Sequence, residues 1–184
     1  MDTNWYGVAV LLGLGLSVPV YRKASHTRAL KSLGLEGVAL VPRLWGLSGL
    51  RMTRANWDGE VRFETSGMRG HVILSAALKK STPSLSFEPG APEGGPMNPE
   101  ILTTGDLEFD RKIAVRGDRE FAKKLLGSDM RKQLMALDRL GGRVGSLGGG
   151  SLVIAGPLLT RSAELREFLK SCEAVIDRIV ACEG

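Results

Sequence analysis

The N-terminal end of the chain is a long apolar run without charge. No charged side chain occurs from Thr3 to Tyr21. As a helix, about 19 residues extend about 28 Å, which matches the hydrocarbon core of a bilayer. Aromatic rings stand at both ends of the run, and cations follow its C-terminal end. Both kinds of residue favour a membrane–water interface. These residues are Trp5, Tyr6, Tyr21, Arg22 and Lys23. The pattern predicts a single transmembrane anchor over residues 1–23.

Two other interpretations of this segment stay open. A cleaved signal peptide normally has positive charge before the apolar run and small residues after it. Here Asp2 precedes the run, and Arg22 and Lys23 follow it. A buried core helix is rarely apolar on all sides with aromatic rings only at its ends. If the segment is an anchor, the cations on its C-terminal side predict that the rest of the chain is cytoplasmic.

A short basic helix is expected next, over residues 24–34. Ser25 is a suitable N-cap, and Arg28 and Lys31 would face lipid phosphates. Each cation near an anionic membrane surface contributes on the order of 1 kcal/mol. The segment therefore predicts that the chain is retained and oriented at the bilayer. The lipid bilayer is the first partner that we expect for this chain.

Period-two alternation begins near residue 38 and predicts β-strands. Val61 and Phe63 alternate with charged neighbours, as in a strand with one solvated face. Directly before them, Asp58 and Gly59 form the pair that favours a tight type I′ hairpin turn. We therefore expect a hairpin whose turn lies at this pair.

Two further strands and a loop complete this half. A second turn is expected at residues 67–70, followed by a nearly continuous apolar run at residues 71–78. Such a run is typical of a central strand covered on both faces. Residues 85–87 add a short strand, and the stretch at about 88–100 is so rich in Pro and Gly that we expect a loop.

The second half changes from strand to helix periodicity. Residues 110–115 are expected to form a strand, residues 119–127 and 128–140 two short helices, and residues 141–151 a Gly-rich hairpin. A long helix over residues 162–181 follows, because apolar residues recur there at intervals of three and four. Its stripe consists of Leu165, Phe168, Leu169, Cys172, Val175, Ile176, Ile179 and Cys182.

These elements predict an α+β fold. Residues 38–181 would form a single domain with a mainly antiparallel sheet packed by the long C-terminal helix, preceded by the single N-terminal transmembrane helix. Of the net charge of +5, residues 1–31 carry +3, from four cations and Asp2, so the remaining residues carry only +2. With aromatic residues at 5%, we expect no nucleic-acid partner.

The chemistry-bearing residues are few. His26 and His71 are the only histidines, so neither a zinc site nor a Ser-His-Asp triad is expected. The Gly-rich stretch lacks the Lys of a phosphate loop, and no cofactor is expected. Cys172 and Cys182 are expected to be buried thiols. One acidic cluster remains as a catalytic or metal-site candidate, because strand alternation would place its members on one face. It consists of Asp106, Glu108 and Asp110.

One stretch resembles a known group of proteins. The sequence TTGDLEFDRKIAVRGDREFAKKLLGSDMRKQLMAL, followed by the Gly-rich hairpin and the long helix, resembles a family of uncharacterised bacterial membrane-anchored proteins over about residues 103–181. That family carries an acidic-x-x-Phe-(Asn/Asp)-x-x-(Phe)-x-Val run, and this chain has Ile113 at an aromatic position. The resemblance implies a bacterial source and a domain tethered to the inner membrane on its cytoplasmic side. It implies no activity, cofactor or catalytic residue.

The sequence therefore predicts a membrane-tethered interaction module that binds a partner protein or assembly. Two alternatives belong to other classes. The first is a membrane-associated hydrolase that uses the acidic cluster. The second is a lipid or small-ligand carrier with an apolar cavity between the sheet and the final helix.

Overall fold

The computed structural model describes residues 24, 26–28, 30–42, 47–66, 69–90, 100–159 and 161–182. The predicted anchor, with Trp5, Tyr6, Tyr21, Arg22 and Lys23, lies outside the described residues. Within the described part of the chain, no helix is both long enough and apolar enough to span a bilayer. Of the expected basic helix at 24–34, the described residues 26–28, 30 and 31 are helical, and Arg28 and Lys31 are exposed.

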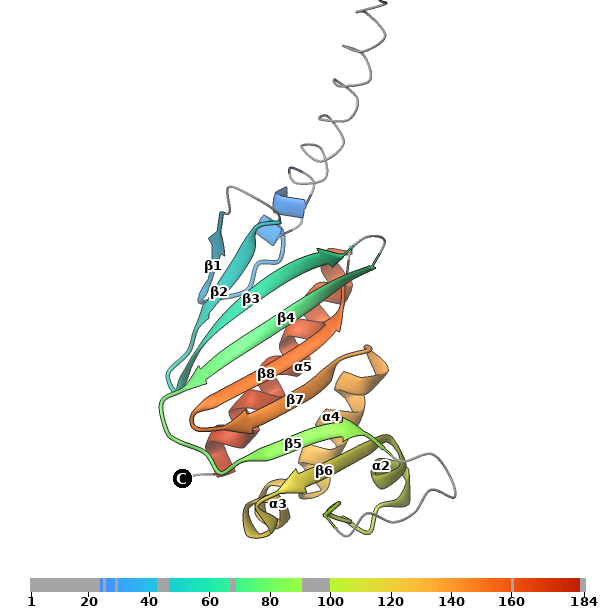
Figure 1. Cartoon of the computed structure of the whole chain (residues 1–184). Coiled ribbons are helices and arrows are strands. Elements are labelled where there is room, and N and C mark those ends of the chain that lie inside the picture. The colour runs from blue at the N-terminus through green and yellow to red at the C-terminus, as the bar shows by residue number, and fades with distance from the viewer. Residues whose placement is uncertain are drawn as a thin grey trace, which may run out of the picture.

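One antiparallel sheet organises the described residues (Figure 1). Its strands are β1 (Val38–Val41), β2 (Gly49–Thr53), β3 (Trp57–Ser66), β4 (Arg69–Leu78), β5 (Leu85–Pro89), β6 (Ile113–Gly117), β7 (Arg143–Gly148) and β8 (Ser151–Pro157). The order of these eight strands is β1-β2-β3-β4-β8-β7-β5-β6. Strand β8 pairs with β4, and β5 pairs with both β6 and β7. Strands from both sides of the Pro/Gly-rich stretch therefore share one sheet.

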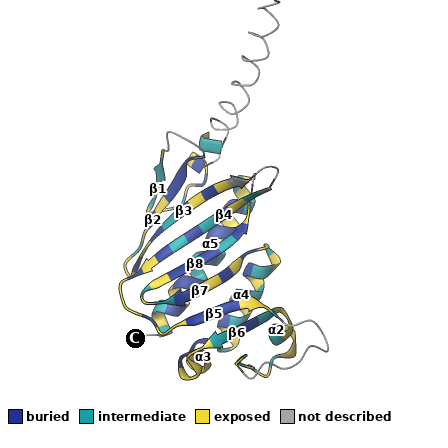
Figure 2. Ribbon diagram, in the orientation of Figure 1, coloured by how far each residue is buried: buried dark blue, intermediate teal, exposed yellow. Residues whose placement is uncertain are grey.

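The helices α2 to α5 accompany the sheet and confirm the expected α+β class. They are α2 (Leu107–Lys112), α3 (Arg119–Leu125), α4 (Ser128–Arg139) and α5 (Ser162–Cys182). Figure 1 shows α4 and α5 behind the sheet, and Figure 2 shows strands whose residues alternate between buried and more exposed. The predicted apolar stripe of α5 is buried from Leu165 to Ile179. An amphipathic helix of this length packs its stripe on the sheet, because the sheet offers the matching apolar face.

Polar contacts fix the C-terminal half of α5 to the turn between β2 and β3. The indole Nε1 of Trp57 donates a hydrogen bond of 2.8 Å to Asp177 Oδ1, and Arg54 forms an ion pair with Glu173. The Trp57 side chain is fully buried, so its N–H needs an acceptor inside the protein. The contact fixes the position of α5 relative to this end of the sheet.

The predicted turn at Asp58 and Gly59 is wrong. Both residues lie inside β3, where Asp58 is opposite Thr53 and Gly59 is opposite Met52. The chain reverses three residues earlier, at Ala55 and Asn56, where the Arg54 N–H donates to the Trp57 carbonyl. The glycine has a packing role instead, because a Cβ there would lie 2.8 Å from the Trp57 ring. Burial of the indole overrides the local turn preference of the Asp-Gly pair.

Two other strand predictions are corrected. Strand β4 is central, as expected, but only one of its faces is buried, since Ile73 and Ser75 are half-buried and Ala77 is exposed. The expected strand at 110–115 begins only at Ile113, because the residues before it form α2. The helix forms because Asp106 caps it, a side-chain interaction that period-two patterning does not register.

The N-terminal described residues pack against β2 and β3. The His26 ring meets the edge of Phe63 with centroids 4.5 Å apart, and its Nε2 lies 3.2 Å from the Ser48 carbonyl oxygen. Burial lowers the pKa of His26, and the hydrogen bond to Ser48 opposes this shift. Leu30 and Leu33 are also buried. This segment is therefore part of the domain core.

The contact between α5 and β8 predicts a glycine requirement. A Cβ at Gly156 would lie 2.6 Å from Cε2 of the fully buried Phe168. We expect Gly156→Ala to lower the free energy of unfolding by about 1–3 kcal/mol through overpacking. The control is Gly145→Ala, where the nearest atom, the Val153 carbonyl oxygen, is 3.6 Å away. Urea denaturation of both variants would measure the difference, and equal stabilities would contradict the packing argument.

Candidate functional site

A surface groove of about 340 Å³ lies beside α3 and the start of α4. Apolar and cationic side chains share its lining. The lining residues are Ile101, Leu102, Thr103, Thr104, Arg119, Ala122, Lys123, Leu126 and Arg131. The predicted acidic cluster lies next to this groove, on and before α2. The two features together form the most polar candidate site in the described part of the chain.

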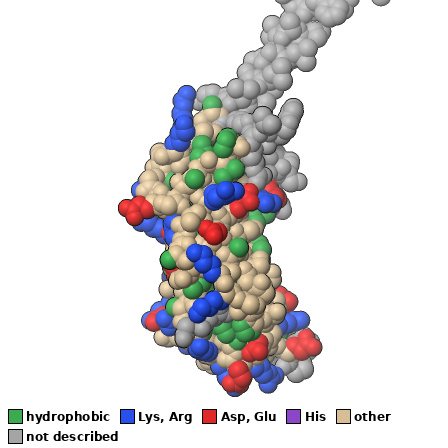
Figure 3. All heavy atoms as spheres, turned by 90° about the vertical axis from the view of Figure 1, so that its left-hand side faces the viewer, with side chains coloured by type: hydrophobic (Ala, Val, Ile, Leu, Met, Phe, Trp, Pro, Cys, Tyr) green, Lys and Arg blue, Asp and Glu red, His purple; other side chains and the backbone are tan. Residues whose placement is uncertain are grey.

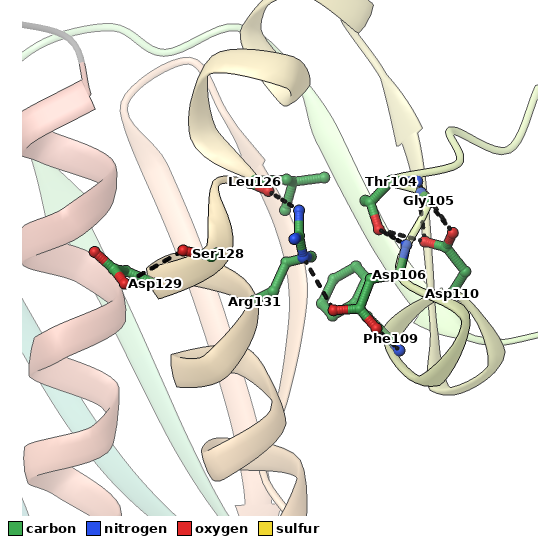
Figure 4. Close-up of polar contacts among 9 residues, drawn as sticks. All are labelled: Thr104, Gly105, Asp106, Phe109, Asp110, Leu126, Ser128, Asp129 and Arg131. Carbon is green, nitrogen blue, oxygen red and sulfur yellow. Dashed lines mark hydrogen bonds and ion pairs between the residues drawn. The ribbon is translucent and has the colours of Figure 1, made fainter.

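Asp106 caps the N-terminus of α2. Its Oδ1 accepts a hydrogen bond of 3.2 Å from the Phe109 N–H, and the Phe109 ring is 1% exposed. Its Oδ2 lies 3.3 Å from Nε of Arg131 on α4 (Figure 4). A capping carboxylate satisfies backbone donors that the helix leaves free. Asp106 therefore holds Phe109 in the core and connects α2 to α4.

Asp110 closes the turn that precedes α2. Its carboxylate accepts hydrogen bonds from the Thr104 N–H at 3.1 Å, the Thr104 hydroxyl at 2.8 Å and the Gly105 N–H at 3.2 Å (Figure 4). Gly105 has φ +80°, a conformation that suits glycine in tight turns. Three donors converge on one carboxylate, so Asp110 stabilises the local backbone.

The acidic cluster does not form the shared face that alternation predicted. Asp106 and Asp110 are held by backbone donors, and Glu108 is 69% exposed with its nearest cation, Lys112, 4.0 Å away. The physical reason is that these residues belong to a cap and a helix, not to a strand. Among the described residues, no group of three or more His, Cys, Asp or Glu side chains is placed to hold a metal ion.

Arg131 connects three elements at the edge of the groove. Its Nη1 donates a hydrogen bond of 2.8 Å to the Leu126 carbonyl, at the end of α3, while Nε faces Asp106. This Nε atom is buried and has no hydrogen-bond partner among the described residues, so its contact with Asp106 is an ion pair only. On the rim, Lys123 is 2.9 Å from Glu120. Contacts beside the groove thus connect α2, α3 and α4, and Lys123 on its rim is already paired with Glu120.

The second candidate is the face of the sheet opposite α4 and α5 (Figure 1). Uncharged side chains from β4 and β8 form a strip along it, here called the open strip. Its residues are Ile73, Ser75, Ala77, Ser151, Val153 and Ala155, and each is half-buried or exposed. The register places Ser75 opposite Val153 and Ile73 opposite Ala155.

Charged side chains border the open strip along β3. Asp58, Glu60, Arg62 and Glu64 project on the same face at alternate positions, and Arg62 Nη2 lies 3.0 Å from Glu60 Oε2. A depression of about 550 Å³ lies between this border and the strip, lined in part by Glu60, Ser75 and Ala77. An uncharged centre with a charged border resembles the core-and-rim arrangement of a protein–protein interface, although the strip lacks the aromatic residues that enrich such cores.

The other predicted residues are placed as follows. Cys172 is buried, and burial raises the pKa of its thiol, so the prediction is confirmed for this residue. Cys182 is only half-buried. His71 is exposed on β4, opposite Pro157. Sequence patterning does not find the open strip, because the nearly continuous apolar run at 71–78 predicts a strand covered on both faces. The signal for the strip is Ser75 and Ala77 at alternate positions.

The hydrogen bonds of Asp110 predict a stability effect. Asp110→Asn removes the charge and turns one acceptor into a donor that faces N–H groups, so we expect the free energy of unfolding to fall by about 1–2 kcal/mol. Glu108→Gln is the control, because the exposed Glu108 should change stability by less than about 0.5 kcal/mol. Chemical denaturation monitored by circular dichroism would measure both. A more destabilising control variant would refute the role given to Asp110.

Comparison with known protein families, with curated proteins and with solved structures finds no match to this chain. The family resemblance over residues 103–181 therefore stays a prediction from the sequence. The features that bear on the function of this chain are the groove, the acidic residues and the open strip.

Proposed function

We propose that this chain is a membrane-tethered interaction module. Residues 1–23 anchor it in the bacterial inner membrane, and the α+β domain binds a partner protein on the cytoplasmic side. The observation that carries the proposal is the open face of the sheet. Both long helices, α4 and α5, lie on the opposite face, while the open strip is uncharged and bordered by the charges of β3.

The alternative of a hydrolase has less support. Two of the three acidic residues accept backbone hydrogen bonds that define α2 and its preceding turn. If such a carboxylate took part in proton transfer, the turn would lose its hydrogen-bond acceptor, and the fold would be destabilised. Asp106 also forms an ion pair with Arg131 on α4, so its second oxygen is engaged in the contact between α2 and α4. The cluster therefore suits a structural role.

The alternative of a carrier with a cavity between the sheet and α5 also has less support. Phe168, Leu169, Cys172 and Val175 on α5 are fully buried in that layer. At Gly142 and Gly156, an added Cβ would lie within 2.8 Å of the Phe168 ring. The ring thus packs directly on the backbone of this part of the sheet.

The membrane part of the proposal rests on the sequence at both sides of residue 23. The uncharged run ends at Arg22 and Lys23, and Arg28 and Lys31 follow. The latter two side chains are exposed in the described structure. Exposed cations close to an apolar segment favour an anionic membrane surface on the cytoplasmic side.

We expect the anchor to decide where the chain is found in the cell. The full-length chain with a C-terminal tag should sediment with inner membranes and resist carbonate extraction, whereas a version without residues 1–23 should not. In intact spheroplasts, external protease should leave the tag uncut, and it should cut the tag after lysis. Cleavage in intact spheroplasts would refute the cytoplasmic orientation, and carbonate extraction of the full-length chain would refute the anchor.

We expect Ala77→Arg to weaken partner binding at the open strip. Ala77 is exposed, so the variant should fold normally, while its long cationic side chain should obstruct this end of the open strip. Cross-linking and purification of the tagged full-length chain from native membranes should recover at least about tenfold less partner for this variant. The matched control is Ala181→Arg, at an exposed position on α5. Equal recovery from both variants would exclude the open strip as the binding surface.

A further inference from the structure

The two edges of the sheet differ. At the β6 edge, Leu102 forms an isolated antiparallel bridge with Val115, and its N–H donates to the Val115 carbonyl at 2.8 Å. The segment before α2 thus covers part of that edge. At the other edge, β1 pairs with β2 on its inner side, and no strand pairs with its outer side among the described residues. An uncovered edge offers a template for another strand.

The backbone groups that β1 offers can be identified from its register. The Thr53 N–H donates to the Gly37 carbonyl, and the pairing places Val38 opposite Met52 and Ala39 opposite Arg51. In an antiparallel ladder, hydrogen-bonded pairs alternate with non-hydrogen-bonded pairs. Ala39 therefore bonds toward β2. The N–H and C=O groups of Val38 and Leu40 point to the outer side.

The side chains of β1 do not protect this edge. Its sequence, Val-Ala-Leu-Val, contains no charge and no proline, although monomeric proteins usually place one or the other on an exposed edge strand. Val38 and Leu40 pack against the core, and Ala39 is exposed on the open face. Figure 3, which views the left-hand side of Figure 1, shows hydrophobic side chains gathered in its upper part, at the level of β1.

We propose that β1 pairs with β1 of a second copy of this chain, antiparallel, about a two-fold axis that passes beside Ala39. Val38 then lies opposite the partner subunit's Leu40, and the two exchange N–H and C=O bonds. The two Ala39 residues face each other as a non-hydrogen-bonded pair. Because β1 is uncharged, the two copies meet without repulsion between like charges.

The facing of the side chains selects this register. Pairing Ala39 with the partner subunit's Leu40 would place a residue of the open face beside a residue of the core face, because a shift of one residue exchanges the faces of a strand. A register centred on Leu40 would place Val38 opposite the partner subunit's Pro42, which has no N–H to donate. Only the pairing centred on Ala39 makes all its bonds within Val38–Val41 while extending the core across both copies.

Disulfide trapping in the full-length chain tests this register. In a Cys182→Ser background, Ala39→Cys should form a covalent dimer on mild oxidation, because Cα atoms of a non-hydrogen-bonded pair lie about 4.5 Å apart. Val41→Cys is the matched control, since its two copies would be four residues out of register, about 13 Å apart. We expect at least tenfold more dimer from Ala39→Cys. Equal yields, or no dimer from either variant, would overturn the proposal.

A charge exchange at the same position provides a second test that needs no oxidation. Ala39→Lys and Ala39→Glu each place like charges opposite one another, so each should reduce the dimer about two- to fivefold. Co-expression of the two differently tagged variants should restore pairing between them. If neither variant changes the dimer, or if the mixture does not recover, the proposal is wrong. Its failure would leave the open strip untouched, since β4 lies three strands from β1.

Discussion

The packing of α5 on one face of the sheet is the constraint on which the rest of the structure depends. The fully buried Phe168 lies directly on the backbone at Gly142 and Gly156, so helix and strands meet more closely than side chains at those positions would permit. At its other end, α5 is held by the Trp57–Asp177 hydrogen bond and the Arg54–Glu173 ion pair. Apolar burial supplies the free energy of this contact, and the polar pairs set its orientation.

This packing leaves two surfaces without helices. With α4 and α5 on one side of the sheet, the other side keeps its open strip and its charged border, and β1 keeps the outward N–H and C=O groups of Val38 and Leu40. Both surfaces suit association with protein more than chemistry on a small molecule. One provides an uncharged strip with a charged border, and the other a row of backbone hydrogen-bonding groups. The proposed partner and the proposed self-association therefore use different parts of the domain.

The acidic residues beside the groove show how local structure changes the role of a side chain. As members of a strand, Asp106, Glu108 and Asp110 would share a face. As cap and first turn of α2, they separate, because Asp106 accepts from the Phe109 N–H and Asp110 from the turn at Thr104 and Gly105. Arg131 then connects the cap to the end of α3. Carboxylates near a helix N-terminus are favoured there by the helix dipole, which requires no catalytic role.

The sequence by itself determined the features that depend on local periodicity: the α+β class, the positions of α3 and α4, and the stripe of α5. Only the tertiary structure decided where strands far apart in the chain meet. Burial of Trp57 moved the Asp58–Gly59 pair from a turn into β3. Packing of α4 and α5 on one side of the sheet left the other face of β4 open. Periodicity shows which residues avoid water, but it does not show which distant element covers those residues. The covering element depends on contacts between segments that the chain brings together only on folding.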